Sequence, residues 1–130
     1  MKKNFLIIIA NYYKDISIGL LSSAKRFIPK NSKFKVIEVP GVFEIPVTIS
    51  KNIKKYDGFI ALGCVIKGET PHFDFICYST FISLLNLSTE SKKPIGNGII
   101  TALNMRQAKK RSLIKGKEAA NAVLEIIKND

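Results

Sequence analysis

The sequence contains few residues that could form a metal centre or a disulfide framework. Its 130 residues include only two cysteines and one histidine. Cys64 and Cys77 are too far apart for a C-x-x-C redox pair, and their spacing matches no four-ligand zinc pattern. A single histidine excludes a histidine-rich metal site. We therefore expect two reduced, structural cysteines and no metal.

Long apolar runs are also missing. A membrane-spanning helix needs about 20 apolar residues, whereas the N-terminal run Phe5–Ala10 ends at Asn11. That run is also shorter than the core of a signal peptide. No repeat, linker or low-complexity tract divides the chain. These absences predict a single domain over residues 1–130, located in the cytoplasm without membrane contact, and large enough to bury about two-thirds of its unfolded surface.

Acidic residues are scarce, with 10 Asp and Glu against 21 Lys and Arg. A basic surface can bind nucleic acid by releasing counterions from phosphates. Here the basic residues are mostly scattered lysines, without the interleaved aromatic residues that stack on single-stranded bases. We interpret them as solvated surface and expect no nucleic-acid partner. A basic nucleic-acid binder stays an alternative, and it would show steep salt dependence.

Strand-like and helix-like segments alternate along the chain. Strands are predicted at Phe5–Ala10, Phe34–Val39, Phe59–Cys64 and Pro94–Thr101. Helices are predicted at Ile16–Phe27, Pro46–Ile53 and Pro71–Leu87, followed by two closing helical segments that begin near Met105 and Gly116, the second ending at Lys128. This alternation favours a parallel sheet with helices on both faces and right-handed crossovers. The expected fold class is α/β, a three-layer sandwich around a central four-stranded parallel sheet, flavodoxin-like.

The most informative stretch surrounds the only histidine, His72. The segment Gly63–Asp74 reads GCVIKGETPHFD and follows the apolar run Gly58–Leu62. A buried strand that leads through a Gly/Thr/Pro turn into a helix is where open α/β sheets bind ligands, because helix N-termini offer free N–H groups. This pattern predicts the active site at the turn.

Four stretches, in order along the chain, resemble the 6,7-dimethyl-8-ribityllumazine synthase family. They are VPGVFEIP at Val39–Pro46, the stretch Gly63–Cys77, GIIT at Gly98–Thr101 followed by Gln107, Ala108 and Arg111, and KGKEAA at Lys115–Ala120. Each stretch alone is a weak signal. The ordered set covers nearly the whole chain and is specific.

The resemblance implies a transferase of riboflavin biosynthesis. Such an enzyme condenses 5-amino-6-(D-ribitylamino)uracil with 3,4-dihydroxy-2-butanone 4-phosphate to 6,7-dimethyl-8-ribityllumazine, releasing phosphate and water. It uses no metal and no organic cofactor. Its partners are its small-molecule substrates and further copies of the same chain, with sites formed between the subunits of a pentamer.

Several residues match family positions that act on the phosphate or on protons. His72 matches the proton-transfer residue, and an imidazole can both take and give a proton near neutrality. Glu69 and Thr70 match the phosphate-binding turn, although Thr70 also fits a plain helix N-cap. Arg111 matches a phosphate-binding arginine supplied by a neighbouring subunit, where a guanidinium fork suits a phosphate. Lys115 is a weaker candidate for the same anion.

Other residues match contacts to the aminouracil. Tyr12 matches the aromatic position that stacks on the pyrimidine. Further matches are Val42, Phe43 and Glu44 along the ring and ribityl chain, and Cys64, Val65 and Ile66 at the polar edge of the ring. Core packing would also explain part of Val65 and Ile66. Tyr13 replaces an Asn of many members, and Asn97 replaces a Phe at a position that still suits a substrate contact.

Two further expectations concern assembly and an alternative class of function. Only Met1, Lys2, Lys3 and Asn4 precede the first predicted strand, whereas many relatives that build large closed shells carry a longer N-terminal segment. We therefore expect a free pentamer or a pair of pentamers. The alternative class is a non-catalytic protein that binds a flavin-like or pterin-like ligand, which would need the stacking aromatic residue but neither His72 nor Arg111.

Overall fold

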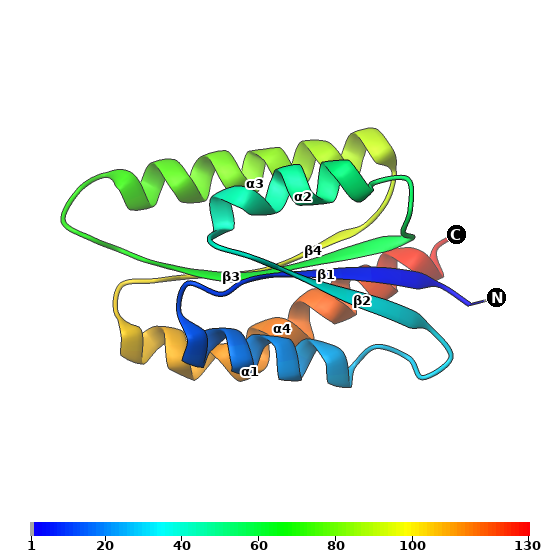
Figure 1. Ribbon diagram of the computed structural model, residues 1–130, viewed down its shortest axis with the longest axis horizontal. Helices are drawn as coiled ribbons and strands as arrows, with labels where there is room; N and C mark the ends of the chain where they lie inside the picture. The colour runs from blue at the N-terminus through cyan, green and yellow to red at the C-terminus, as the bar shows by residue number, and fades with distance from the viewer. Residues whose placement is uncertain (1) are drawn as a thin grey trace.

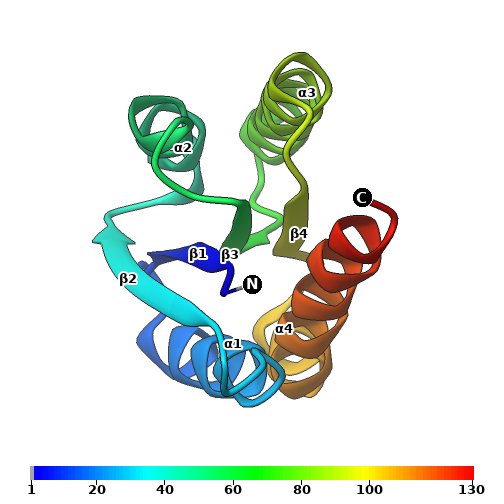
Figure 2. The ribbon, with the colours of Figure 1, turned by 90° about the vertical axis from the view of Figure 1, so that its right-hand side faces the viewer.

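Four parallel strands form the centre of the structure, a computed structural model that describes residues 2–130. The strands are β1 (Asn4–Ala10), β2 (Lys33–Val39), β3 (Gly58–Ile66) and β4 (Ile95–Ala102), in the spatial order β2-β1-β3-β4. The helices are α1 (Lys14–Arg26), α2 (Ile45–Asn52), α3 (His72–Ser91) and α4 (Met105–Lys128), and a 3₁₀ turn at Val42–Glu44 precedes α2. Helices α2 and α3 cover one face of the sheet, and α1 and α4 cover the other (Figures 1 and 2).

Strand β1 shows why the sheet is buried on both faces. Its odd-numbered residues, Phe5, Ile7 and Ile9, belong to the apolar cluster beneath α1 and α4. Its even-numbered residues from Leu6 to Ala10 belong to the cluster beneath α2 and α3. Side chains alternate between the faces of a strand, so a strand covered on both sides must be apolar throughout. The predicted three-layer α/β fold with a four-stranded parallel sheet is confirmed.

The closing helix differs from the prediction. The expected two segments are a single helix, α4, and Gly116 lies inside it. A Cβ at Gly116 would collide with the side chain of Ser23 and the carbonyl of Leu20 on α1. Glycine in a helix interior costs about 1 kcal/mol relative to alanine, but here its missing side chain lets α4 pack directly on α1. Ser23 strengthens this contact, because its hydroxyl donates to the carbonyl of Ser112 at 3.4 Å.

Helix α3 is longer than predicted by about one turn. It continues past Leu87 to Ser91, and Lys92 then adopts the left-handed conformation, with φ at 60°, that ends many helices. Residues 2–130 contain no helix long and apolar enough to cross a membrane.

The carboxyl ends of β1, β2 and β3 lie at the same edge of the sheet, as parallel pairing requires. Three connecting segments meet the sheet there: the one that leads into α1, the 3₁₀ turn before α2, and the loop that leads into α3. The crevice outside this edge is the usual ligand position in open α/β sheets. The fold therefore gathers the strand-end residues that the sequence singled out.

Candidate active site

A cavity of about 290 Å³ opens at the carboxyl ends of β1, β2 and β3. The lining residues are Tyr12, Tyr13, Gly41, Val42, Phe43, Cys64, Val65, Ile66, His72 and Ile76. Most of the residues predicted to contact the aminouracil therefore lie together, and the predicted acid–base residue His72 lies with them. The walls are mainly apolar and aromatic, which suits a flat ring better than a highly charged ligand.

A close approach between Val42 and Gly63 builds the floor of this cavity. A Cβ at Gly63 would stand 2.6 Å from Val42 Cγ1 and 3.2 Å from the Cβ of Ala10. Real side chains do not approach so closely, so only glycine at this position lets the 3₁₀ turn rest directly on β3. Val42 and Cys64 are both buried beneath the cavity. The floor is therefore a packed, apolar surface.

Two adjacent tyrosines form one wall. Tyr12 is 74% exposed, whereas Tyr13 is half-buried. Their ring centroids are 4.9 Å apart and the ring planes meet at 82°, which is an edge-to-face pair. Burial raises the pKa of the Tyr13 phenol, with further contributions from Cys64 and Tyr12. The Tyr13 phenol is therefore neutral near neutral pH.

The cysteine in the cavity is not an activated nucleophile. Burial, and then the neighbouring Cys77, raise the pKa of the Cys64 thiol from 9.0 to about 11. The pKa of the Cys77 thiol is also raised, by burial and then by Asp74. Neither cysteine is in a disulfide, as expected from their spacing. The thiolate is the reactive form, so both side chains act as small neutral groups near pH 7.

We expect Cys64 in the folded protein to resist alkylation by iodoacetamide between pH 7 and 10. A raised pKa means less thiolate at any given pH, so the folded-state rate should stay below that of the urea-unfolded chain throughout this range. A Cys77→Ser variant isolates the signal of Cys64, and mass spectrometry measures its modification. The same shift adds stability that is fully present below pH 9.0 and is lost as the pH rises through about 11. Equal rates for folded and unfolded protein at pH 8 would contradict this prediction.

The loop between β3 and α3 brings His72 to the rim of the cavity. His72 is the first residue of α3, and its backbone N–H donates to Thr70 Oγ1 at 3.4 Å. The N-cap residue of α3 is Pro71, and no side chain makes a capping hydrogen bond there, so the alternative role of Thr70 as a plain helix N-cap is wrong. Glu69 and Thr70 are exposed and lie just before His72 in the same loop. Neither of them lines the cavity. The first turn of α3 carries the positive end of the helix dipole, which favours an anion here.

The structure does not bring every predicted residue into this cavity. Arg111 is exposed on α4, on the opposite face of the sheet from α3. Lys115 lies on the same helix. Asn97 is exposed in the middle of β4, where its side-chain oxygen accepts a hydrogen bond from the Ile99 N–H at 3.1 Å. None of the three lines the cavity of the same chain.

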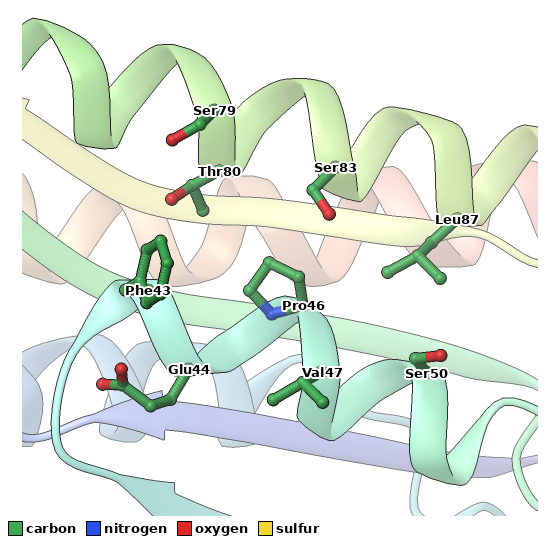
Figure 3. Close-up of a pocket in the computed structure, with 9 residues that line it drawn as sticks. All are labelled: Phe43, Glu44, Pro46, Val47, Ser50, Ser79, Thr80, Ser83 and Leu87. Atoms are coloured by element: carbon green, nitrogen blue, oxygen red, sulfur yellow. The ribbon is translucent and has the colours of Figure 1, made fainter.

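Glu44 lies in a second hollow, which the sequence did not predict. This groove of about 600 Å³ runs between α2 and α3 (Figure 3). It is lined by Phe43, Glu44, Pro46, Val47, Ser50, Ser79, Thr80, Ser83 and Leu87. Phe43, 66% exposed, lines both hollows and joins them. Thr80 is only 3% exposed, and its hydroxyl has no hydrogen-bond partner among residues 2–130.

The fold and the cavity define a small parallel α/β protein whose one histidine lies beside an aromatic wall. The family described as 6,7-dimethyl-8-ribityllumazine synthase matches residues 2–130, and the chain belongs to this family. The resemblance noted from the four sequence stretches is confirmed.

Curated relatives with the same description cover most of the chain. A protein of Beijerinckia indica is 39% identical over 131 residues, which is 94% of this chain and 72% of the relative. One of Agrobacterium fabrum is 38% identical over 138 residues, covering 97% and 93% of the two chains. One of Bartonella tribocorum is 40% identical over 134 residues, covering 97% and 89%. Each is described as 6,7-dimethyl-8-ribityllumazine synthase.

Proposed function

We propose that the cavity at the ends of β1, β2 and β3 is where this chain carries out the condensation of its family. The substrates are 5-amino-6-(D-ribitylamino)uracil and 3,4-dihydroxy-2-butanone 4-phosphate, and the product is 6,7-dimethyl-8-ribityllumazine. The chain is thus a transferase of riboflavin biosynthesis, acting in the cytoplasm. One observation carries the proposal: His72 lies on the rim of an aromatic-walled cavity that is formed at three strand ends.

The aminouracil occupies the aromatic part of this cavity. Tyr12 stacks on the pyrimidine ring, and Val42 and Phe43 contact the ring and the ribityl chain. The segment Cys64–Ile66 contacts the polar edge of the ring through its backbone. It pairs with β4 on one side, whereas the pairing of β3 with β1 ends at Leu62, so the backbone on the β1 side faces the cavity. Glu44 accepts hydrogen bonds from the ribityl hydroxyls, which extend past Phe43 into the groove between α2 and α3.

His72 transfers the protons of the reaction. Imine formation at the ketone, loss of phosphate and ring closure each require proton transfer, and an imidazole can act in both directions near neutrality. The His72 side chain is exposed at the cavity rim, so it reaches substrate without opening the core.

The phosphate of the second substrate binds at the beginning of α3. Backbone N–H groups and the helix dipole favour an anion there, and Thr70 adds its hydroxyl. Glu69 contributes through its backbone, because its carboxylate would repel the phosphate. Arg111 completes the site from another copy of the chain, with Lys115 as a second cation near it.

A homopentamer, or a pair of pentamers, supplies that second copy. Three observations support self-association: Arg111 lies across the sheet from His72, the groove between α2 and α3 is open, and the Thr80 hydroxyl in it is unpartnered among residues 2–130. Helix α3 also exposes an apolar stripe at intervals of three and four residues, formed by Phe75, Tyr78, Ile82 and Leu85. We propose that a second copy covers this face and that Asn97, exposed on the sheet's last strand, contacts the substrate of a neighbour.

Mixing the purified protein with both substrates tests the function. We expect the absorbance of the lumazine product to appear, and phosphate to be released in equal amount, only when both substrates are present. Omitting either substrate is the control. Binding of the aminouracil without product would favour the ligand-binding alternative. Salt-dependent retention of nucleic acid without product would favour the nucleic-acid binder.

A further inference from the structure

Tyr13 occupies the inner end of the aromatic wall, and the proposed mechanism gives it no role. Its ring lies between the protein interior and the cavity. On one side it packs against the apolar cluster beneath α1 and α4, and on the other it lines the substrate cavity. Its neighbour Tyr12 lines the same cavity but is 74% exposed. The fixed ring of the pair is therefore Tyr13, and the ring with rotational freedom is Tyr12.

The backbone of Tyr13 is fixed as well. Tyr13 is the cap residue that precedes α1, and its carbonyl accepts hydrogen bonds from the Ser17 N–H at 2.9 Å and the Ser17 hydroxyl at 3.0 Å. The single proton of that hydroxyl is shared with the carbonyl of Ala10, also 3.0 Å away, at the end of β1. This arrangement holds the start of α1 to the end of the strand, so the position of the Tyr13 ring follows from the fold itself.

The two rings meet edge to face, with centroids 4.9 Å apart and planes at 82°. Such a contact favours one orientation of the partner ring over its alternatives. A mobile aromatic ring must be ordered when it stacks on a ligand, and that ordering lowers affinity. A ring that is already ordered avoids this cost.

We propose that Tyr13 is a positioning residue that holds the Tyr12 ring in the orientation that stacks on the pyrimidine of the aminouracil. It acts through Tyr12 and has no contact with the reacting atoms. This inference rests on the proposed function and deepens it. It predicts that replacing Tyr13 weakens binding of the aminouracil alone, because the butanone phosphate makes its main contacts at the beginning of α3.

Steady-state kinetics with two variants tests the proposal. Tyr13→Leu removes the ring, and we expect the KM for the aminouracil to rise about 2- to 10-fold while the KM for the butanone phosphate is unchanged. Tyr13→Phe keeps the ring and should match the wild-type protein. Loss of affinity in Tyr13→Phe would instead indicate a direct hydroxyl contact and overturn the proposal.

A double-mutant cycle separates positioning from a general structural effect. Tyr12→Leu should raise the KM for the aminouracil, and adding Tyr13→Leu to it should cause no further rise, because the residue that Tyr13 holds is gone. Additive effects of the two substitutions would overturn the proposal. A matched control is Tyr56→Leu, which breaks another edge-to-face pair, Tyr56 with Phe59, at the opposite end of β3. It should lower the Tm without changing either KM.

Direct binding keeps this test independent of turnover. Calorimetric titration of the aminouracil alone measures its Kd for each variant, whether or not product forms. A wild-type protein that binds the aminouracil without turning it over would contradict the proposed function. The Kd values of the variants would still test the role of Tyr13. An unchanged Kd in Tyr13→Leu would overturn the positioning role even if the enzyme is fully active.

Discussion

His72→Ala is expected to lower the rate of product formation by about 10²- to 10⁴-fold, the usual contribution of a well-placed acid–base side chain. Binding of the aminouracil should stay close to wild type, because His72 lies at the rim of the cavity and Tyr12 forms its wall. Single-turnover measurements report the rate, and calorimetric titration of the aminouracil reports the binding. The fold should not suffer, since His72 is exposed and contributes nothing to either apolar cluster.

A control on the same helix separates chemistry from damage to α3. Glu90→Gln changes an exposed residue in the last turn of α3, far from the cavity, and should keep the wild-type rate. A wild-type rate in His72→Ala would remove the histidine from the mechanism.

Arg111→Ala is expected to lower kcat/KM for the butanone phosphate by about 10- to 100-fold, because a hydrogen bond to a charged group is lost. Mixed oligomers of this variant and His72→Ala should recover activity. With equal amounts of the two chains, about a quarter of the shared sites would combine an intact His72 with an intact Arg111 from its neighbour. Co-expression with two different affinity tags gives the mixed oligomers, and the product assay measures them.

The control for this experiment is a chain that carries both substitutions. Co-expressed in equal amounts with the wild-type chain, the His72→Ala/Arg111→Ala chain again leaves about a quarter of the shared sites intact, as chance pairing predicts. Light scattering of the same samples distinguishes a pentamer or pentamer pair from a large shell. Mixed oligomers of the two single variants that stay inactive would show that both residues serve one chain's site.

The strands and the cavity were predictable because their signals are local. Each buried parallel strand is a continuous apolar run, as in Phe5–Ala10, and a strand end followed by a turn and a helix marks the ligand side of the sheet. The position of His72 follows from that pattern alone. The roles assigned to Glu69, Thr70 and Arg111 came from the family resemblance, and they stay predictions.

Features that depend on distant contacts were not predictable. Gly116 indicated a break between two helices, because its partner on α1 lies far away along the chain. The groove between α2 and α3 depends on how two helices pack, and no spacing in the sequence reports this. The pairing of Tyr12 with Tyr13 required the ring orientations. Arg111 illustrates the same limit, because its position relative to a neighbour's His72 is set by assembly.

The direct contact between α1 and α4 has a consequence for the order of folding. The buried residues Ile16, Leu20 and Ala24 of α1 share a cluster with Ala119, Ala120 and Val123 of α4. During synthesis, α1 leaves the ribosome long before α4 exists, so the part of its apolar face that packs on α4 stays open to water or to chaperones until nearly the whole chain has emerged. The β1–α1–β2 segment therefore cannot complete its core as an independent unit. We infer that the final docking of α4 converts a loosely packed nascent chain into the cooperative native structure.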